Sequence, residues 1–257
     1  MWLFYSPEIS VDMEMPQEEA AHCIRVLRLK EGDMVKLTDG KGSFYDASIS
    51  CVTGKKCFLH IEKEYPQQPL WSGYIHLAIA PTKLMDRNEW FVEKAVEFGV
   101  DEISFIRTAH SERDVIKLER IEKIAVSAMK QSQKAVLPKL NPMVKFSDFI
   151  SSNQDGDRFI AHCEELNKIE LKDSVIRGNK TTVLIGPEGD FSPAEIEMAT
   201  KAGYRGVSLG PSRLRTETAA LAAVHIMNLV NQIGLILLLM LPFVSANAQM
   251  RFDEKLI

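Results

Sequence analysis

The sequence has few cysteines and no pattern that would join them into a metal site or a disulfide framework. Its 257 residues include 4 cysteines, and no two of them form a Cys-x-x-Cys pair. The 6 histidines contain no His-Glu-x-x-His motif. Structural zinc sites and small secreted folds depend on such patterns, so we expect no metal site and a reducing, cytoplasmic setting.

An excess of positive charge is also missing, and so is a signal peptide. The chain has 31 Lys and Arg against 35 Asp and Glu, a net charge of −4, so its bulk charge does not indicate a nucleic-acid partner. A local basic face is still predicted, since residues 104–140 contain eight basic and four acidic side chains. The N-terminus lacks the charged and apolar segments of a signal peptide.

The segment 233–257 differs from the rest of the chain. Ile233–Val244 is almost wholly apolar, and Ala246–Gln249 follows it like the cleavage site of a signal peptide, but at the wrong end of the chain. The apolar run is shorter than the roughly 20 residues that a membrane-spanning helix needs, so we expect no membrane association. We interpret the segment as a foreign extension from a frameshift or read-through. The alternative is a native tail that docks on the body or on a partner.

Residues 1–70 are predicted to form a small β-rich domain. One helix, from about Gln17 to Val26, precedes the strands. The predicted strands are Val35–Thr38, Phe44–Ile49 and Cys57–Ile61, with turns at Asp39–Gly42 and Thr53–Lys56. The pattern is typical of a small β-barrel that binds a ligand, and Pro66–Pro69 is the expected linker after it.

Residues 71–232 show strand patterns that alternate with helix patterns. The predicted strands are Tyr74–Ala80, Glu102–Ile106, Arg158–His162, Thr181–Ile185 and Gly206–Leu209. The predicted helices are Asp86–Phe98, Lys117–Val136, Ser192–Ala202 and Thr216 to about Gln232. The alternation predicts an α/β fold with a mostly parallel sheet covered by helices on both faces. Gly99 is the expected stop of the first helix.

A glycine-rich loop, Gly186–Gly189, follows the predicted strand Thr181–Ile185. Open α/β sheets bind ligands at the carboxyl ends of their strands. The next helix has a full start signal, with Ser192 as N-cap, Pro193 at the first helical position and Glu195 completing a capping box. A purely structural turn explains the glycines about as well, so the functional interpretation depends on a second loop.

The second loop follows the strand Gly206–Leu209 and is rich in polar side chains. Residues 210–220 contain two arginines, two threonines and a glutamate before an alanine-rich helix, for which Thr216 is the expected N-cap. The segment matches neither the phosphate-binding Gly-Lys-Ser/Thr loop nor the Gly-x-Gly-x-x-Gly fingerprint. Together, the two loops predict two walls of one small-molecule site.

The two loops together resemble a known family. Ile185–Ile196 reads I-G-P-E-G-D-F-S-P-A-E-I and Leu209–Ala219 reads L-G-P-S-R-L-R-T-E-T-A, similar to the RsmE-type methyltransferases of the SPOUT superfamily. The resemblance extends over about residues 1–232 and includes His22–Lys30, Lys83–Gly99, Ser111–Arg113, Gln131, Ser132 and Pro138. Two residues depart from the family pattern: Asp190 stands where a glycine is common, and Lys134 where an arginine is usual.

The resemblance implies both a fold and a reaction. It implies methylation of uridine N3 in 16S ribosomal RNA, within the decoding region of the 30S subunit, with S-adenosylmethionine as the methyl donor. The implied fold is a PUA-like RNA-binding barrel over residues 1–70 and a trefoil-knotted methyltransferase domain over residues 71–232, in a homodimer. The donor-binding residues that it implies are Ile185, Gly186, Pro187, Glu188, Gly189, Leu209, Gly210, Leu214, Arg215, Thr216 and Thr218.

Methyl transfer to N3 requires that the N3 proton be removed and that charge on the uridine be stabilised. Glu217 is the candidate base, and Arg213 or Arg215 is the candidate group for stabilising the anion or holding the donor's carboxylate. The alternative is that Glu217 pairs with Arg215 or Arg213 and only orders the loop.

Basic residues spread along the chain are candidates for contacts with RNA phosphates. They are Arg25, Arg28, Lys30, Arg87, Arg107, Arg113, Lys130 and Lys134. The alternative for each is an ordinary solvated side chain. Two other functions also remain open: another SPOUT chemistry, such as ribose 2′-O or transfer-RNA methylation, and a non-catalytic RNA-binding assembly factor.

Overall fold

The structure is a computed structural model that describes residues 2–9, 13–152, 155–164 and 168–232. The predicted foreign extension, 233–257, lies outside the described residues. The chain divides into two compact units. Unit 1 contains the residues up to Pro69 together with Val92–Glu97 and Lys117–Lys139, and unit 2 contains Leu70–Phe91, Phe98–Ile116 and the residues from Leu140 onward.

Unit 1 is built on a four-stranded sheet in the order β1-β2-β3-β4. The strands are β1 (Leu3–Tyr5), β2 (Met34–Thr38), β3 (Ser43–Thr53) and β4 (Lys56–Pro66). The last three confirm the predicted strands, although β3 and β4 are longer than expected and β4 runs into the expected linker. Their alternating burial places Val35, Leu37, Ala47 and Leu59 in the core of the unit.

The helices of unit 1 differ from the prediction in detail. Helix α1 (Gln17–Ala21) continues as a π-helical segment, η1 (His22–Val26), so the predicted helix has the expected extent. Helix α3 (Leu118–Gln131) ends five residues earlier than predicted. It ends there because the Ser132 hydroxyl donates to the carbonyl of Ala128 (2.7 Å) and Gln133 has a left-handed backbone, with φ 54°.

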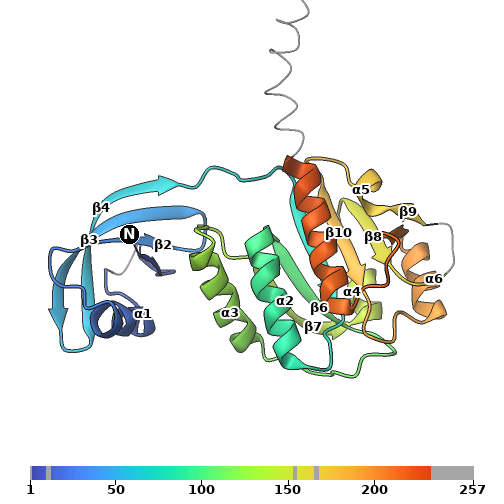
Figure 1. Cartoon of the computed structure of the whole chain (residues 1–257), viewed down its shortest axis with the longest axis horizontal. Helices are drawn as coiled ribbons and strands as arrows, with labels where there is room; N and C mark the ends of the chain where they lie inside the picture. Colours follow the sequence, from blue (N-terminus) through green and yellow to red (C-terminus); the bar gives the residue numbers. More distant parts are fainter. Residues whose placement is uncertain (1, 10–12, 153–154, 165–167, 233–257) are drawn as a thin grey trace, which may run out of the picture. The chain divides into compact units, whose positions relative to one another are not determined.

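Unit 2 is built on a seven-stranded sheet in the order β7-β6-β5-β10-β8-β11-β9 (Figure 1). Its strands are β5 (Tyr74–Ile79), β6 (Glu102–Arg107), β7 (Lys139–Lys145), β8 (Asp157–Ala161), β9 (Ile169–Glu170), β10 (Lys180–Ile185) and β11 (Arg205–Ser208). From β6 to β9 all neighbours pair in parallel. The predicted α/β fold with a mostly parallel sheet is therefore confirmed.

Helices cover the sheet, and a buried apolar layer joins them to it. They are α2 (Met85–Phe98), α4 (Phe146–Ser151), α5 (Leu171–Ser174), α6 (Pro193–Lys201) and a helix over residues 216–232. Side chains of α4 and α6 pack with Ala78, Ile160 and Leu184, which share one face of three neighbouring strands. Their neighbours Leu77, Phe159 and Val183 are buried on the other face, as both-sided coverage requires.

The elements that the sequence did not predict are short or irregular. Strand β1 has three residues, β9 two and helix α5 four, which is too short for a period to be recognised. Strand β7 contains Pro142, which lowers its strand signal but is tolerated because β7 lies at an edge of the sheet.

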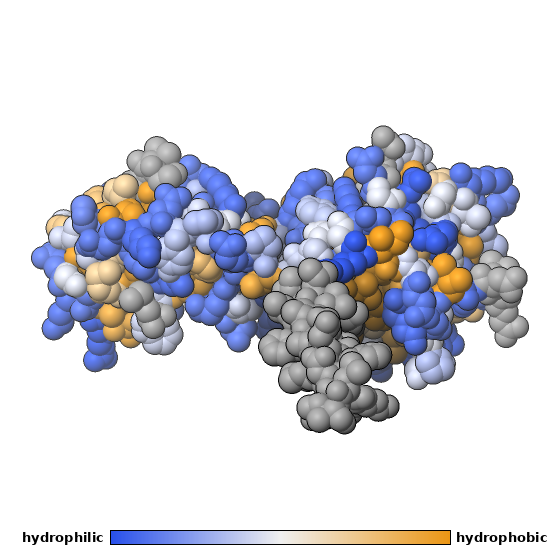
Figure 2. Space-filling model, turned by 90° about the horizontal axis from the view of Figure 1, so that it is seen from above, coloured by the Kyte–Doolittle hydropathy of each residue, from blue (hydrophilic) through white to orange (hydrophobic). Residues whose placement is uncertain are grey.

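The surface is mostly hydrophilic in the view of Figure 2, with hydrophobic residues scattered over it. Among the described residues, Trp2 and Val26 are the most exposed large apolar side chains of unit 1, at 57% and 67%. Within the described ranges, none of the helices has the length and apolar character to span a membrane.

Gly99 stops helix α2, as the sequence predicted, and the structure shows why glycine is needed. Its backbone is left-handed, with φ +98°, and a Cβ at this position would lie 2.6 Å from the ring of Trp71. That ring is held by a hydrogen bond from its Nε1 to Asp101 (3.3 Å), so it cannot easily move away. Gly178 is also left-handed, with φ +84°, but a Cβ there would meet nothing within 4 Å.

Replacing Gly99 with alanine should lower the free energy of unfolding by about 3 kcal/mol, since backbone strain adds to overpacking against Trp71. Gly178→Ala is the matched control and should cost about 1 kcal/mol, because only the backbone strain remains. Denaturant unfolding measures both. Equal losses for the two variants would contradict the clash with Trp71.

Candidate active site

Three neighbouring strands of unit 2 end in the same row. Ile185 of β10 pairs with Ala161 of β8, and Ala161 pairs in turn with Val207 of β11. Because the strands are parallel, the segments that follow them leave the same edge of the sheet. The two loops singled out in the sequence therefore lie on either side of the end of β8.

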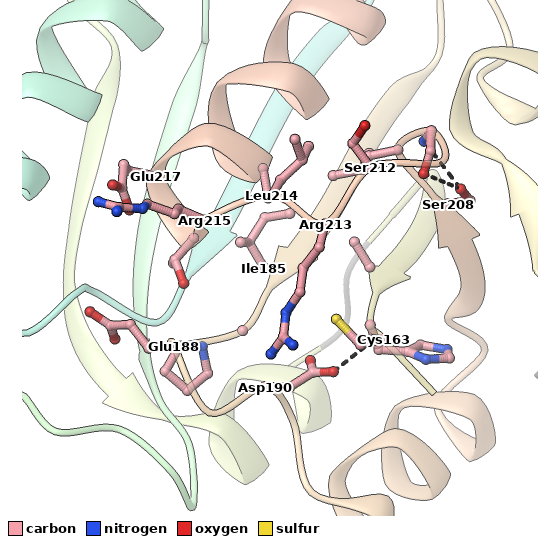
Figure 3. A pocket seen from close by; sticks show the side chains of 18 of the residues that line it. Cys163, Ile185, Glu188, Asp190, Ser208, Ser212, Arg213, Leu214, Arg215 and Glu217 are labelled. Carbon is pink, nitrogen blue, oxygen red and sulfur yellow. Dashed lines mark hydrogen bonds between the residues drawn. The ribbon is translucent and has the colours of Figure 1, made fainter. Parts of the chain in front are cut away.

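A cavity of about 700 Å³ lies between these segments (Figure 3). Its volume falls in the range of about 300–1,000 Å³ that small-molecule sites occupy. It is lined by most of the residues expected from the sequence: Ile185, Gly186, Pro187, Glu188, Gly189, Leu209, Gly210, Arg213, Leu214, Arg215, Thr216 and Glu217. Thr218 is the exception, since it is exposed and not part of the lining.

Sequence reasoning missed the third wall of the cavity. The segment after β8 contributes His162, Cys163 and Lys168, and helix α2 contributes Arg87. A polar stretch after the predicted strand Arg158–His162 was the available signal. It could not be used, because the sequence does not reveal that β8 lies between β10 and β11.

Asp190 fixes the loop that follows β10. Its backbone is left-handed, with φ 61°, which aspartate tolerates better than most residues. Its carboxylate accepts from the backbone amides of Cys163 (2.7 Å) and Phe191 (2.8 Å), and its own amide donates to the carbonyl of Pro187 (3.0 Å). The side chain of Asp190 therefore ties the loop to the end of β8.

The predicted start of the helix after this loop is confirmed. Ser192 is the N-cap of α6, Pro193 follows it, and Ser192 and Glu195 form both hydrogen bonds of a capping box. The remaining oxygen of Glu195 accepts from the amide of Ala109 (2.8 Å), in the segment after β6. The loop is therefore anchored at its far end as well.

The second loop is held by Ser208 and opens into the helix at residues 216–232. The Ser208 hydroxyl accepts from the amide of Gly210 (3.1 Å), whose φ is +112°. The carbonyl of Arg215 accepts from the amide of Ala219 (2.7 Å). The N-cap is therefore Arg215, and the sequence prediction of Thr216 was one residue too late.

Glu217 and Arg87 face each other in the lining. Arg87 Nη1 lies 3.5 Å from Glu217 Oε1, so Glu217 pairs with helix α2 and not with Arg213 or Arg215, the partners in the alternative that the sequence left open. The Glu217 side chain is only 9% exposed. Its second oxygen, Oε2, is buried and has no hydrogen-bond partner in the part of the chain that the structure describes. A buried carboxylate oxygen with this spare capacity, in a cavity wall, is a candidate to accept a ligand's proton.

The opposite end of the cavity combines charges of both signs. Arg213 extends across the cavity toward Asp190 (Figure 3). Burial lowers the pKa of His162, and the nearby Lys168 lowers it further. Burial also raises the pKa of the Cys163 thiol, followed by the effect of Asp190, so the thiol is not activated. These groups are suited to binding a zwitterionic ligand.

The basic residues expected to contact RNA differ in how exposed their side chains are, and Lys130 pairs with Glu19. Arg25, Arg28, Lys30 and Arg107 are exposed. Lys134 is 8% exposed and its ammonium donates to the carbonyl of Glu97 (2.9 Å), and burial lowers its pKa. The sequence suggested a phosphate contact for Lys134, and its burial and internal bond argue against that role.

Two family models match the chain. A model described as an RNA methyltransferase domain matches residues 69–228, which is more than half of the chain, and one described as an RNA methyltransferase PUA domain matches residues 16–62. The curated relatives include the ribosomal RNA small subunit methyltransferases E of Rickettsia conorii and Bacillus subtilis. They are 27% and 29% identical, over 82% and 80% of this chain and 87% and 85% of theirs.

Solved structures resemble the chain over nearly its whole described length. A probable rRNA methyltransferase from Porphyromonas gingivalis is 44% identical, with a TM-score of 0.85 over 90% of this chain and 98% of its own. A ribosomal RNA small subunit methyltransferase E from Neisseria gonorrhoeae, bound to S-adenosyl methionine, is 27% identical, with a TM-score of 0.78 over the same shares of the two chains.

Replacing Asp190 with alanine should lower the free energy of unfolding by about 2 kcal/mol, because two hydrogen bonds are lost and left-handed strain is added. Asp190→Gly should cost less, since glycine takes this backbone conformation freely. Asp190→Asn should cost least, because it keeps one acceptor oxygen. Denaturant unfolding ranks the three variants, and an alanine variant as stable as the unmodified protein would rule out this role.

Proposed function

The chain belongs to the RNA methyltransferase family, and on this premise we propose that it methylates N3 of a uridine in 16S ribosomal RNA with S-adenosylmethionine as donor. The observation that carries the proposal is the cavity whose walls are the two loops after β10 and β11. A relative similar over 90% of this chain binds S-adenosyl methionine. The position N3 and the uridine come from the resemblance of the loop sequences to the RsmE-type family.

The cavity has groups that fit each part of the donor. The glycines Gly186, Gly189 and Gly210 in its walls suit a flat adenosine, because a glycine backbone permits close approach. Arg213 suits the donor's carboxylate, and Asp190 and Glu188 suit its positive charges. S-adenosylmethionine supplies an electrophilic methyl group on a sulfonium centre.

Glu217 is the proposed base of the reaction. In the transfer, the N3–methyl bond forms as the methyl–sulfur bond breaks, and the N3 proton goes to an acceptor. Glu217 Oε2 is buried in the site without a partner among the described residues, and the Arg87 contact to Oε1 fixes the other side of the carboxylate. Arg215, next to it in the lining, is the proposed stabiliser of negative charge on the uridine.

We assign RNA binding to unit 1, where Arg25, Arg28 and Lys30 are exposed. The functional domains proposed are residues 1–70, a PUA-like barrel, and residues 71–232, the knotted methyltransferase domain. The four-stranded sheet and the isolated bridge between Glu14 and Phe58 support a barrel, and the non-sequential strand order of unit 2 is compatible with a knot. The exposed bases Arg25, Arg28 and Lys30 suit RNA phosphates, with the 30S particle as the proposed substrate.

A homodimer is part of the proposal. In unit 2, helix α2 and the helix at residues 216–232 touch through Phe98 and His225, whose ring centroids are 4.8 Å apart. Trp90, Phe98 and Leu229 are 47%, 41% and 45% exposed on these two helices. Exposed apolar side chains of this size suit a second copy of the chain.

The four free thiols fit a cytoplasmic setting, where the protein would contribute to ribosome biogenesis.

Nucleoside analysis of small-subunit RNA tests the reaction. Undermethylated 30S subunits are incubated with the protein and labelled S-adenosylmethionine, then digested and separated by mass. The expected product is N3-methyluridine. A ribose-methylated nucleoside, or methyl groups in transfer RNA instead, would establish one of the other chemistries, and no donor binding by calorimetry would support a non-catalytic role.

Glu217→Gln should lower the turnover rate by about 100-fold or more, since it removes the proposed base but keeps the shape of the side chain. Donor affinity should change little. The remaining activity should rise with pH, because hydroxide then replaces the base. Glu197→Gln is the matched control, since Glu197 is exposed on α6, pairs with Lys201 and does not line the cavity, and it should retain most of the turnover. If Glu217→Gln weakens donor binding and leaves turnover intact, Glu217 only orders the loop.

A further inference from the structure

We propose that Arg113 is a positioning residue of the methyl-donor site and not an RNA contact. Its guanidinium holds the backbone turn that precedes helix α2. That turn bonds to Glu188 on one wall of the cavity, and it positions Arg87, the partner of Glu217, on another wall. The inference rests on the proposed function, because it assigns Arg113 a role in the same site. It also gives a function to the Ser111–Arg113 motif, which the donor loops alone do not explain.

The guanidinium of Arg113 donates hydrogen bonds to backbone carbonyls within unit 2. Its Nε donates to the carbonyl of Thr82 (3.1 Å), and its Nη2 donates to the carbonyl of Lys83. Two donors of one planar group thus bond to carbonyls of adjacent residues, a geometry that a lysine ammonium cannot reproduce. Arg113 is also partly buried, so the side chain is not a free surface cation.

The turn that Arg113 holds is the start of helix α2. Thr82 and Asn88 are 0% and 1% exposed, and Asn88 Nδ2 donates to the carbonyls of Thr82 (2.9 Å) and Leu84 (3.1 Å). The amide of Thr82 donates back to Asn88 Oδ1 (2.9 Å). Asn88 holds the turn from within helix α2, and Arg113 holds it from the segment after β6. The carbonyls of the turn therefore accept hydrogen bonds from two different elements.

The turn is connected to both walls of the cavity. The amide of Lys83 donates to Glu188 Oε1 (3.1 Å), which holds the loop after β10. Arg87 lies in the first turn of α2, directly after the held residues, and pairs with Glu217. A shift of the turn would therefore move Glu188 and Arg87 together, and with them the carboxylate proposed as base.

The same segment also supports the donor loop from behind. A Cβ on Gly189 would lie 3.0 Å from Cβ of His110, so the loop backbone packs closely on that side chain. His110 Nδ1 donates to the carbonyl of Asp190 (3.0 Å), and the amide of Ala109 donates to Glu195. Residues 109–113 thus contact the second half of the donor loop and the helix that follows it, and Arg113 extends the contact to the turn before helix α2.

Donor affinity without RNA, measured by calorimetry, tests the inference. Arg113→Ala should weaken the affinity for S-adenosylmethionine by about tenfold, the effect of losing one to two charge-assisted hydrogen bonds that order the site. Arg113→Lys should weaken it similarly, because it keeps the charge but not the paired geometry. Arg107→Ala is the matched control on the neighbouring surface, where Arg107 Nη1 lies 3.6 Å from Asp114 Oδ1. This variant should bind the donor with unchanged affinity.

The salt dependence of RNA binding separates this role from a phosphate contact. Arg113→Ala should leave the slope unchanged, whereas loss of a phosphate contact lowers it by about one. Donor affinity within twofold of the unmodified protein for both Arg113 variants overturns the inference, and a reduced slope for Arg113→Ala does the same.

Hydrogen exchange gives a readout that does not depend on the donor. In Arg113→Ala the amides of Lys83 and Arg87 should exchange faster than in Arg107→Ala, with the melting temperature recording any global loss of stability. Unchanged exchange at Lys83 also overturns the inference. Failure of the unmodified protein to bind S-adenosylmethionine would instead count against the proposed function, while the exchange comparison still decides the role of Arg113.

Discussion

The parallel pairing of β8 with both β10 and β11 is the constraint on which the site depends. It aligns Ile185, Ala161 and Val207 in one row, so three separate segments leave the sheet at the same edge. Each segment then needs its own anchor, since parallel strands do not join their ends directly. Asp190 connects the loop after β10 to the end of β8, and Ser208 holds the loop after β11. The capping box at Ser192 fixes the start of helix α6, into which the loop after β10 leads.

The sequence was sufficient for the longer strands and helices and for two of the three cavity walls. Long strands and helices show a clear periodicity of apolar residues. A glycine-rich loop between a strand and a capped helix is expected at the carboxyl end of that strand, where α/β folds bind ligands. Strand order is different, because it results from packing between segments far apart in the chain. The third wall, with Cys163 and His162, therefore became visible only when β8 was found between β10 and β11.

The contacts of charged residues are even harder to predict than strand order, because a sequence contains the charge of a side chain but not the identity of its partner. Lys134 was expected on an RNA-binding surface, yet it is buried against the carbonyl of Glu97. For Glu217 the sequence left open a pairing within its own loop as the alternative to a catalytic role, and the structure pairs it with Arg87. In each case the partner is more than thirty residues away, so no local pattern could have predicted it.

Arg113 explains why a basic residue in a family of RNA-binding enzymes need not touch RNA. A carbonyl at a turn before a helix has no partner within that helix, and leaving it unpaired in a partly buried position costs about 1–3 kcal/mol. Arg113, from a neighbouring loop, supplies a donor to the carbonyl of Lys83 and a second donor, beside Asn88, to the carbonyl of Thr82. The loop after β10 and helix α2 belong to separate crossovers of the sheet, and the turn that Arg113 holds bonds to the first and begins the second. Arg113 would thereby couple the wall proposed to bind the donor to the carboxylate proposed to receive the proton.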